Sequence, residues 1–190
     1  HVTTEVQYLP TSNLLAKPQL ISQRAPGHEY YVDHQGDSAQ SGRFIIRSNQ
    51  RQANFDVYQV ALGDASENSS AQLNPANWQS IVAGDERTYL TNHLVLQTHL
   101  LVEARIDGLD QMMVVEQNGD SHLIQMPEES YSLGFGTNAD YKSKFLRLSY
   151  TSMVTPNTVY DYTLDTRDLQ QRKVQQVPGG YDAKNFVTRR

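Results

Sequence analysis

The sequence contains no cysteine, carries no excess of basic residues and holds no long hydrophobic run. Without cysteine it has no disulfide framework and no thiolate metal site, which favours a reducing compartment. We therefore expect a cytoplasmic protein, with the periplasm as the alternative. No stretch approaches the ~18 apolar residues of a membrane span, and residues His1 to Pro10 lack the basic and apolar regions of a signal peptide, so neither is expected. The 16 Lys and Arg are outnumbered by 21 Asp and Glu, and no basic stripe favours nucleic acid.

What the sequence does contain are strand signals. Hydrophobic residues make up only 38% of the chain, yet there are 11 tyrosines, a balance that suits sheets with one solvated face. Short β-branched and aromatic runs recur between Gly, Pro, Asn and Asp, which predicts an all-β fold. The expected strands are Thr3–Leu9, Gln19–Gln23, Glu29–His34, Arg43–Asn49, Phe55–Leu62, Trp78–Val82, Thr88–Leu90, His93–Val102, Gln111–Gln117, His122–Met126, Ser130–Phe135, Lys144–Thr151, Thr158–Leu164 and Arg172–Val177. Helix is expected only as short turns near Pro75–Trp78 and Ala183–Phe186, and Ala65–Asn77 is expected to be a loop.

The expected strands fall into groups of four. Three stretches resemble one another: "FDVYQVAL", "QMMVVEQ" and "TVYDYTL", which begin at Phe55, Gln111 and Thr158. Each follows a longer, almost continuously apolar strand and precedes a short polar one, as expected from the inside to the outside of a propeller blade. The period of roughly 50 residues is also that of propeller blades. We therefore predict a partial β-propeller of about three to four four-stranded antiparallel blades over residues 1–177.

A family resemblance sharpens this prediction. The stretch "LRLSYTSMVTPNTVYDYTL" from Leu146, followed by "KVQQVPGGYD" from Lys173, resembles the end of the β-propeller in serine peptidases of the prolyl oligopeptidase family, within it the oligopeptidase B (protease II) branch. The stretches "TTEVQYL", "EYYVDHQGD", "RFIIRSN" and "NHLVL" keep the family's order and spacing, so the resemblance covers essentially the whole chain.

The resemblance implies a seven-bladed propeller that covers an α/β-hydrolase domain with a Ser-Asp-His triad. In this branch the hydrolase cleaves short peptides after Lys or Arg, and the propeller controls their access. The hydrolase would follow residue 190, so this chain is expected to hold no catalytic residue, metal or cofactor. Its partners would be the rest of the propeller, the hydrolase domain and short basic peptides.

Residues 178–190 are expected to form the linker toward the hydrolase domain. Pro178, Gly179, Gly180 and Tyr181 suit a turn that tolerates a change of chain direction. The sequence departs from the family at Gln176 and at Arg189, where Glu is usual, which puts the usual polar contacts of the exit in doubt.

Two serines deserve a test as nucleophiles. A hydrolase serine needs a Gly-x-Ser-x-Gly turn between a strand and a helix. The stretches "GDSAQ" around Ser38 and "GDSHL" around Ser121 lack the second glycine, and neither precedes a helical pattern. We interpret both as ordinary surface serines.

Four histidines are candidate metal ligands. His28 and His34 stand six residues apart, as do His93 and His99. On a strand each pair would share a face about 20 Å apart, too far for one metal ion. We therefore expect solvent-facing or hydrogen-bonded side chains.

The remaining polar and aromatic candidates have ordinary interpretations. Glu128 and Glu129 are expected in a solvated turn, and the alternative is that Glu129, Asp33 or Asp161 lines a cavity that attracts cationic peptides. Trp78 and the tyrosines are expected in the core rather than as ligand-stacking groups. The hydroxyls of "LRLSYTSMVT" are expected to satisfy turn and backbone groups.

One alternative to a peptidase propeller stays open. Because a fold does not settle function, a stand-alone propeller module that binds a partner without catalysis fits the same strands. Under either interpretation an isolated partial propeller exposes blade faces that neighbours normally bury, so the isolated chain is expected to self-associate.

Overall fold

The computed structural model describes residues 3–37, 42–62 and 73–190 and consists of three four-stranded antiparallel sheets and one two-stranded sheet. The small sheet pairs β1 (Gln7–Tyr8) with β2 (Gln19–Leu20). The first blade contains β3 (Tyr30–Gln35), β4 (Arg43–Ser48), β5 (Asp56–Ala61) and β6 (Gln79–Val82). The second contains β7 (Thr88–Val95), β8 (His99–Ile106), β9 (Leu109–Glu116) and β10 (Ser121–Leu123), and the third β11 (Ser132–Phe135), β12 (Phe145–Thr151), β13 (Thr158–Thr163) and β14 (Leu169–Val174).

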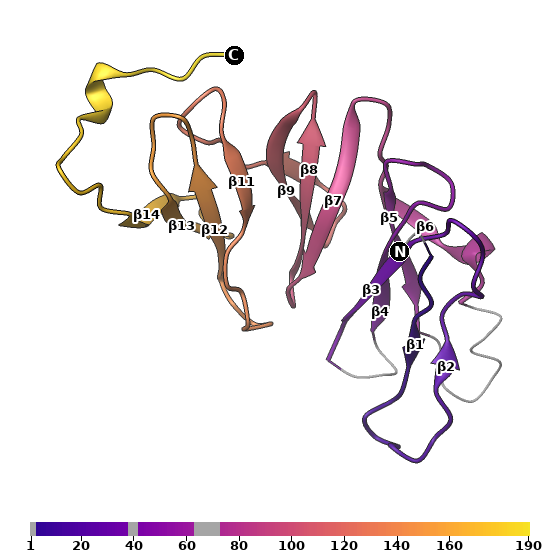
Figure 1. Ribbon diagram of the computed structural model, residues 1–190. Helices are drawn as coiled ribbons and strands as arrows, with labels where there is room; N and C mark the ends of the chain where they lie inside the picture. The colour runs from indigo at the N-terminus through magenta and orange to yellow at the C-terminus, as the bar shows by residue number, and fades with distance from the viewer. Residues whose placement is uncertain (1–2, 38–41, 63–72) are drawn as a thin grey trace.

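Each blade is a simple meander in which sequential strands are neighbours. The three sheets follow one another side by side along the chain, and the C-terminal segment extends beyond the third (Figure 1). The first strands face the preceding blade: β7 contacts β3 and β4, and β11 contacts β9. This radial succession of meanders is the architecture of a β-propeller, as the sequence predicted.

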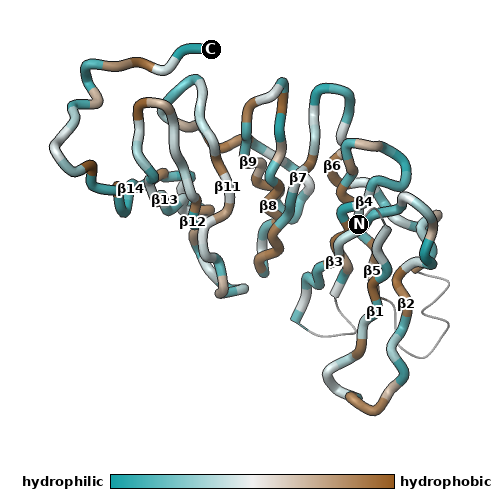
Figure 2. Tube along the Cα trace, viewed as in Figure 1, coloured by the Kyte–Doolittle hydropathy of each residue, from teal (hydrophilic) through white to brown (hydrophobic). Residues whose placement is uncertain are grey.

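Burial falls from the second strand of a blade to the fourth. In β4 only Arg43 is partly exposed and the other residues are buried, whereas in β14 all residues but Leu169 are exposed. Figure 2 shows the same contrast between the hydrophobic β8 and the polar β14. A strand between two neighbours with blades on both faces has no solvated side, so it needs apolar residues throughout.

Three hydrophobic clusters fill the spaces between the sheets. Ile45, Val57, Leu90 and Val102 belong to the cluster between the first and second blades. A second cluster lies between the second and third blades and includes Met112, Leu146 and Tyr150. The third joins the first blade to the β1–β2 sheet and contains Trp78.

The predicted strand His93–Val102 is wrong. A hairpin turn at residues 96–98 divides it, and Leu96 donates its backbone N–H to the His99 carbonyl across that turn. The turn is hidden in the sequence because Leu96 is itself buried, 1% exposed, in the core between two blades. The last strand also ends three residues earlier than predicted, at Val174.

Helical structure is as sparse as expected. The two short helices in the described ranges are single 3₁₀ turns, Pro75–Asn77 and Ala183–Asn185. Within residues 3–37, 42–62 and 73–190 no helix is long and apolar enough to cross a membrane.

Candidate functional site

Of the two serines that are candidate nucleophiles, Ser121 does not form an active site. Ser121 is the exposed first residue of β10, and a strand rather than a helix follows it. It therefore lacks the strand-to-helix turn that exposes a hydrolase nucleophile beside backbone donors. Ser38 lies outside the described residues.

The first histidine pair has separate environments. His28 is buried, 6% exposed, precedes β3 and lies 2.9 Å from the Ser48 hydroxyl through its Nε2 atom. Burial lowers its pKa below the ordinary value, because desolvation disfavours the charged ring. His34 lies on β3 beside the Phe44 ring. In the described ranges no group of three His, Asp or Glu residues is placed to hold a metal ion.

The second pair is hydrogen-bonded or ion-paired rather than solvent-facing. The prediction of one shared strand face is wrong, because the turn at residues 96–98 puts His93 on β7 and His99 on β8. The Nε2 atom of His93 lies 3.0 Å from Asp33 Oδ2, and that of His99 lies 3.0 Å from Glu116 Oε2. Each histidine thus faces a carboxylate on another strand.

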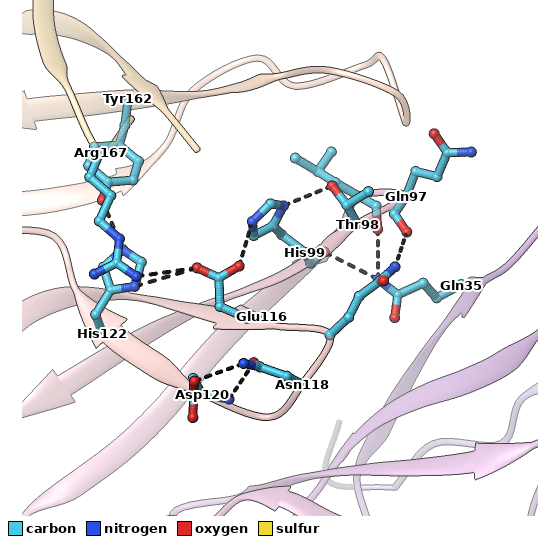
Figure 3. A network of polar contacts seen from close by, with 12 residues as sticks. Gln35, Gln97, Thr98, His99, Glu116, Asn118, Asp120, His122, Tyr162 and Arg167 are labelled. Atoms are coloured by element: carbon cyan, nitrogen blue, oxygen red, sulfur yellow. Dashed lines mark hydrogen bonds and ion pairs between the residues drawn. The ribbon is translucent and has the colours of Figure 1, made fainter. Parts of the chain in front are cut away.

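His99 belongs to a polar network that joins all three blades (Figure 3). Gln35 of the first blade donates its side-chain N–H to the Leu96 carbonyl at 2.7 Å. On the other side, His122 Nε2 lies 2.8 Å from the Tyr162 hydroxyl of the third blade. Burial, helped by the neighbouring Arg167, lowers the pKa of His122. The network therefore fixes neighbouring sheets to one another.

We expect Gln35→Leu to destabilise the contact between the first and second blades. Leucine removes the donor to the Leu96 carbonyl and leaves this backbone acceptor unpaired, which costs about 1–2 kcal/mol of unfolding free energy; the His99 carbonyl keeps the Leu96 N–H as its donor. Urea unfolding measures the change. The matched control is Gln171→Leu on the exposed strand β14, for which we expect a change below about 0.5 kcal/mol; equal losses in the two variants would contradict the role of Gln35.

Asp161, weighed as a cavity-lining acid, is instead enclosed by two arginines. Asp161 is 3% exposed, and its two carboxylate oxygens accept hydrogen bonds from Arg147 Nε at 2.8 Å and Arg172 Nε at 2.8 Å. The hydrogen bond from Arg147 is the main reason that the pKa of Asp161 lies below its ordinary value. Asp161 therefore ties β13 to β12 and β14 and offers no free charge.

Glu128 corrects a second expectation. Rather than standing in a solvated turn, its carboxylate accepts hydrogen bonds from the hydroxyls of Tyr150 at 3.0 Å, Ser152 at 2.6 Å and Thr188 at 2.8 Å, and from that of Thr155. Burial would raise its pKa, but the four hydroxyl donors outweigh burial and the pKa is lowered. Glu129 beside it is exposed, as expected.

The hydroxyl groups in the stretch LRLSYTSMVT, from Leu146, have two roles: they donate to Glu128 and they stabilise a turn. Ser152 Oγ also accepts the backbone N–H groups of Val154 and Thr155, at 3.0 and 2.8 Å, so it organises the turn before β13 as predicted. What sequence reasoning missed was the acceptor, because Glu128 precedes these residues by more than twenty positions.

The C-terminal segment touches the blades at few points. Thr188 is its partly buried residue and bonds to Glu128, and Arg190 donates to the Asp107 carbonyl. Gly179 and Gly180 have φ of 92° and 76°, the left-handed region that favours glycine. The assignment of Pro178, Gly179, Gly180 and Tyr181 to an interdomain linker stays a prediction.

The chain is a β-propeller protein: four-stranded blades follow one another and are joined by polar contacts and by hydrophobic clusters. The family model described as the prolyl oligopeptidase N-terminal β-propeller domain matches residues 1–175. The chain therefore belongs to the prolyl oligopeptidase family, in its propeller domain.

The similar proteins are longer than this chain. Dipeptidyl aminopeptidase BI of Pseudoxanthomonas mexicana is 31% identical over all of this chain and 24% of the relative, and protease 2 of Moraxella lacunata is 28% identical over 97% of this chain and 24% of the relative. The structure of oligopeptidase B from Trypanosoma brucei superimposes with a TM-score of 0.80 and 21% identity over 98% of this chain and 26% of that one. The chain thus spans about a quarter of the length of these relatives.

Proposed function

We propose that this chain is the non-catalytic propeller portion of an oligopeptidase B-like serine peptidase that acts in the cytoplasm. The parent protein would carry a Ser-Asp-His hydrolase domain and cleave short peptides after Lys or Arg. The propeller would control the access of peptides to that domain. The observation that carries this proposal is the family match over residues 1–175 together with the three complete blades.

The rigid seams support the controlling role. A propeller that excludes folded proteins from an active site must keep its blades together. The contacts from Gln35 to Leu96 and from His122 to Tyr162 join neighbouring blades. The segment after β14 makes few contacts, which leaves it able to absorb a relative movement of two domains.

The test uses the full-length protein and a set of fluorogenic peptide amides. We expect kcat/KM for Arg or Lys before the scissile bond to exceed that for Pro or Ala by at least about a hundredfold. A folded protein rich in Lys and Arg should stay intact under the same conditions. Preference for Pro, or release of dipeptides from a free N-terminus, would assign the parent to another branch of the family.

A second measurement separates the peptidase from a stand-alone binding module. The coding sequence after residue 190 should encode a Gly-x-Ser-x-Gly motif followed by Asp and His. If that stretch lacks the motif and the purified product hydrolyses none of the amides, the peptidase proposal is wrong and the binding module replaces it.

A further inference from the structure

A pocket of about 450 Å³ lies between the first and second blades, where β3 approaches β7. Its walls come from three places: Glu5 ahead of β1, Tyr31 and Asp33 on β3, and Asn92 and His93 on β7. The register of β7 shifts between Leu90 and Asn92, just before His93. Such bulges re-aim a side chain and are frequent beside binding sites.

The pocket carries carboxylates that are little neutralised. The Asp33 side chain is 53% exposed, and in the described ranges no Lys or Arg lies within ion-pair distance of it. Glu5 faces Arg24 across 3.8 Å, but Arg24 is 67% exposed and free to swing into solvent. An exposed pair of this length contributes little. The pocket therefore retains negative charge.

His93 supplies an observation independent of these acids. Its side chain is only 3% exposed, and Nε2 lies 3.0 Å from Asp33 Oδ2 without the alignment of a hydrogen bond. Within the described residues Nδ1 has no hydrogen-bond partner either. A buried polar atom without a partner is costly, so in proteins such atoms usually find a ligand or a water molecule.

The accessible charged groups of the pocket set the chemistry of that ligand. They are the carboxylates of Asp33 and Glu5, both hydrogen-bond acceptors, whereas both ring nitrogens of His93 are buried behind them. The fixed cation nearby, Arg47, packs against the Tyr31 ring at 4.4 Å and donates to the Leu90 carbonyl at 3.2 Å.

We propose that this pocket, named the Asp33–His93 pocket, binds a guanidinium or ammonium group, namely the side chain of a basic residue in a peptide. A guanidinium offers five N–H donors in one plane and suits a site with several acceptors. The volume exceeds that of one such side chain. The proposal rests on the proposed function only for the source of the cation; the pocket's chemistry stands apart from it.

The experiment measures binding to the full-length protein by saturation-transfer NMR with two matched probes, n-butylguanidinium and uncharged n-butylurea. We expect the wild-type protein to bind the cation and not the urea. Asp33→Asn should weaken binding of the cation about tenfold, since a hydrogen bond to a charged partner is lost. The control Glu86→Gln removes the same charge from an exposed loop outside the pocket and should leave binding unchanged.

Two outcomes would overturn the proposal: equal affinity in the wild type and in Asp33→Asn, or equal binding of the two probes. Neither outcome depends on hydrolysis. If the protein cleaves after Arg but Asp33→Asn does not change binding, the proposed function stands and the proposed site is wrong. If the protein binds the cation through Asp33 but hydrolyses none of the amides, the proposed site stands and the proposed function is wrong.

Discussion

Asp161→Asn is expected to lower the unfolding free energy by about 2 kcal/mol at pH 7. The carboxylate is nearly buried, with a side chain 4% exposed, between Arg147 and Arg172. Asparagine keeps the shape but loses both ion pairs, and breaking a buried pair is costly. The expected loss is smaller than for a fully buried ion pair, because the arginine side chains are 39% and 54% exposed and can return to water. Urea unfolding of the variant and the wild type gives the difference.

The pH dependence of this difference provides a sharper check. Because the pKa of Asp161 is lowered in the folded state, its contribution is present above the unfolded pKa of about 3.9 and is lost as pH falls through the folded pKa. The gap between wild type and Asp161→Asn should therefore be largest near neutral pH and shrink below about pH 4. Asp165→Asn, an exposed acid in the turn after β13, serves as the control and should show no gap. A gap independent of pH would contradict a stabilising role for the ionised carboxylate.

The periodic part of the fold was readable from the sequence. Strands such as Arg43–Ser48 and Thr158–Thr163 are rich in residues that favour strands, lie between turn formers and belong to units that recur at a period of roughly 50 residues, so pattern and structure agree. Trp78 was also assigned correctly: the residue is 3% exposed in the core, and its Nε1 donates to the Leu73 carbonyl.

The parts that were missed depend on contacts between distant residues. Leu96 occupies a turn yet packs between two blades, so the apolar residues continue into the hairpin and only Gln97 and Thr98 separate Leu96 from the next strand. Glu128 looked like a surface acid because its partners come from β12, from the turn after it and from the C-terminal segment. Such partners become neighbours only after the blades have formed, and no spacing rule along the chain encodes them.

Glu128→Ala is expected to have a still larger effect, a loss of about 2–3 kcal/mol together with release of the C-terminal segment. Four hydroxyl groups share this one carboxylate, and hydrogen bonds to a charged acceptor are stronger than neutral ones. The sum stays well below four separate bonds because Ser152, Thr155 and Thr188 are only half-buried and their hydroxyls can turn toward water. Thr188 is the donor from the segment, so its tether to the third blade is lost.

Backbone NMR order parameters separate the two parts of this prediction. In Glu128→Ala the order parameters of residues 186–190 should fall below about 0.6, because the Thr188 hydroxyl loses its acceptor, while those of β8 in the second blade keep their wild-type values. Glu129→Ala, a change of the exposed neighbour, is the matched control and should alter neither stability nor order. If Glu128→Ala lowers stability while the segment keeps its order, Glu128 supports the third blade without holding the segment. Unchanged stability would show that the hydroxyl cluster contributes nothing to it.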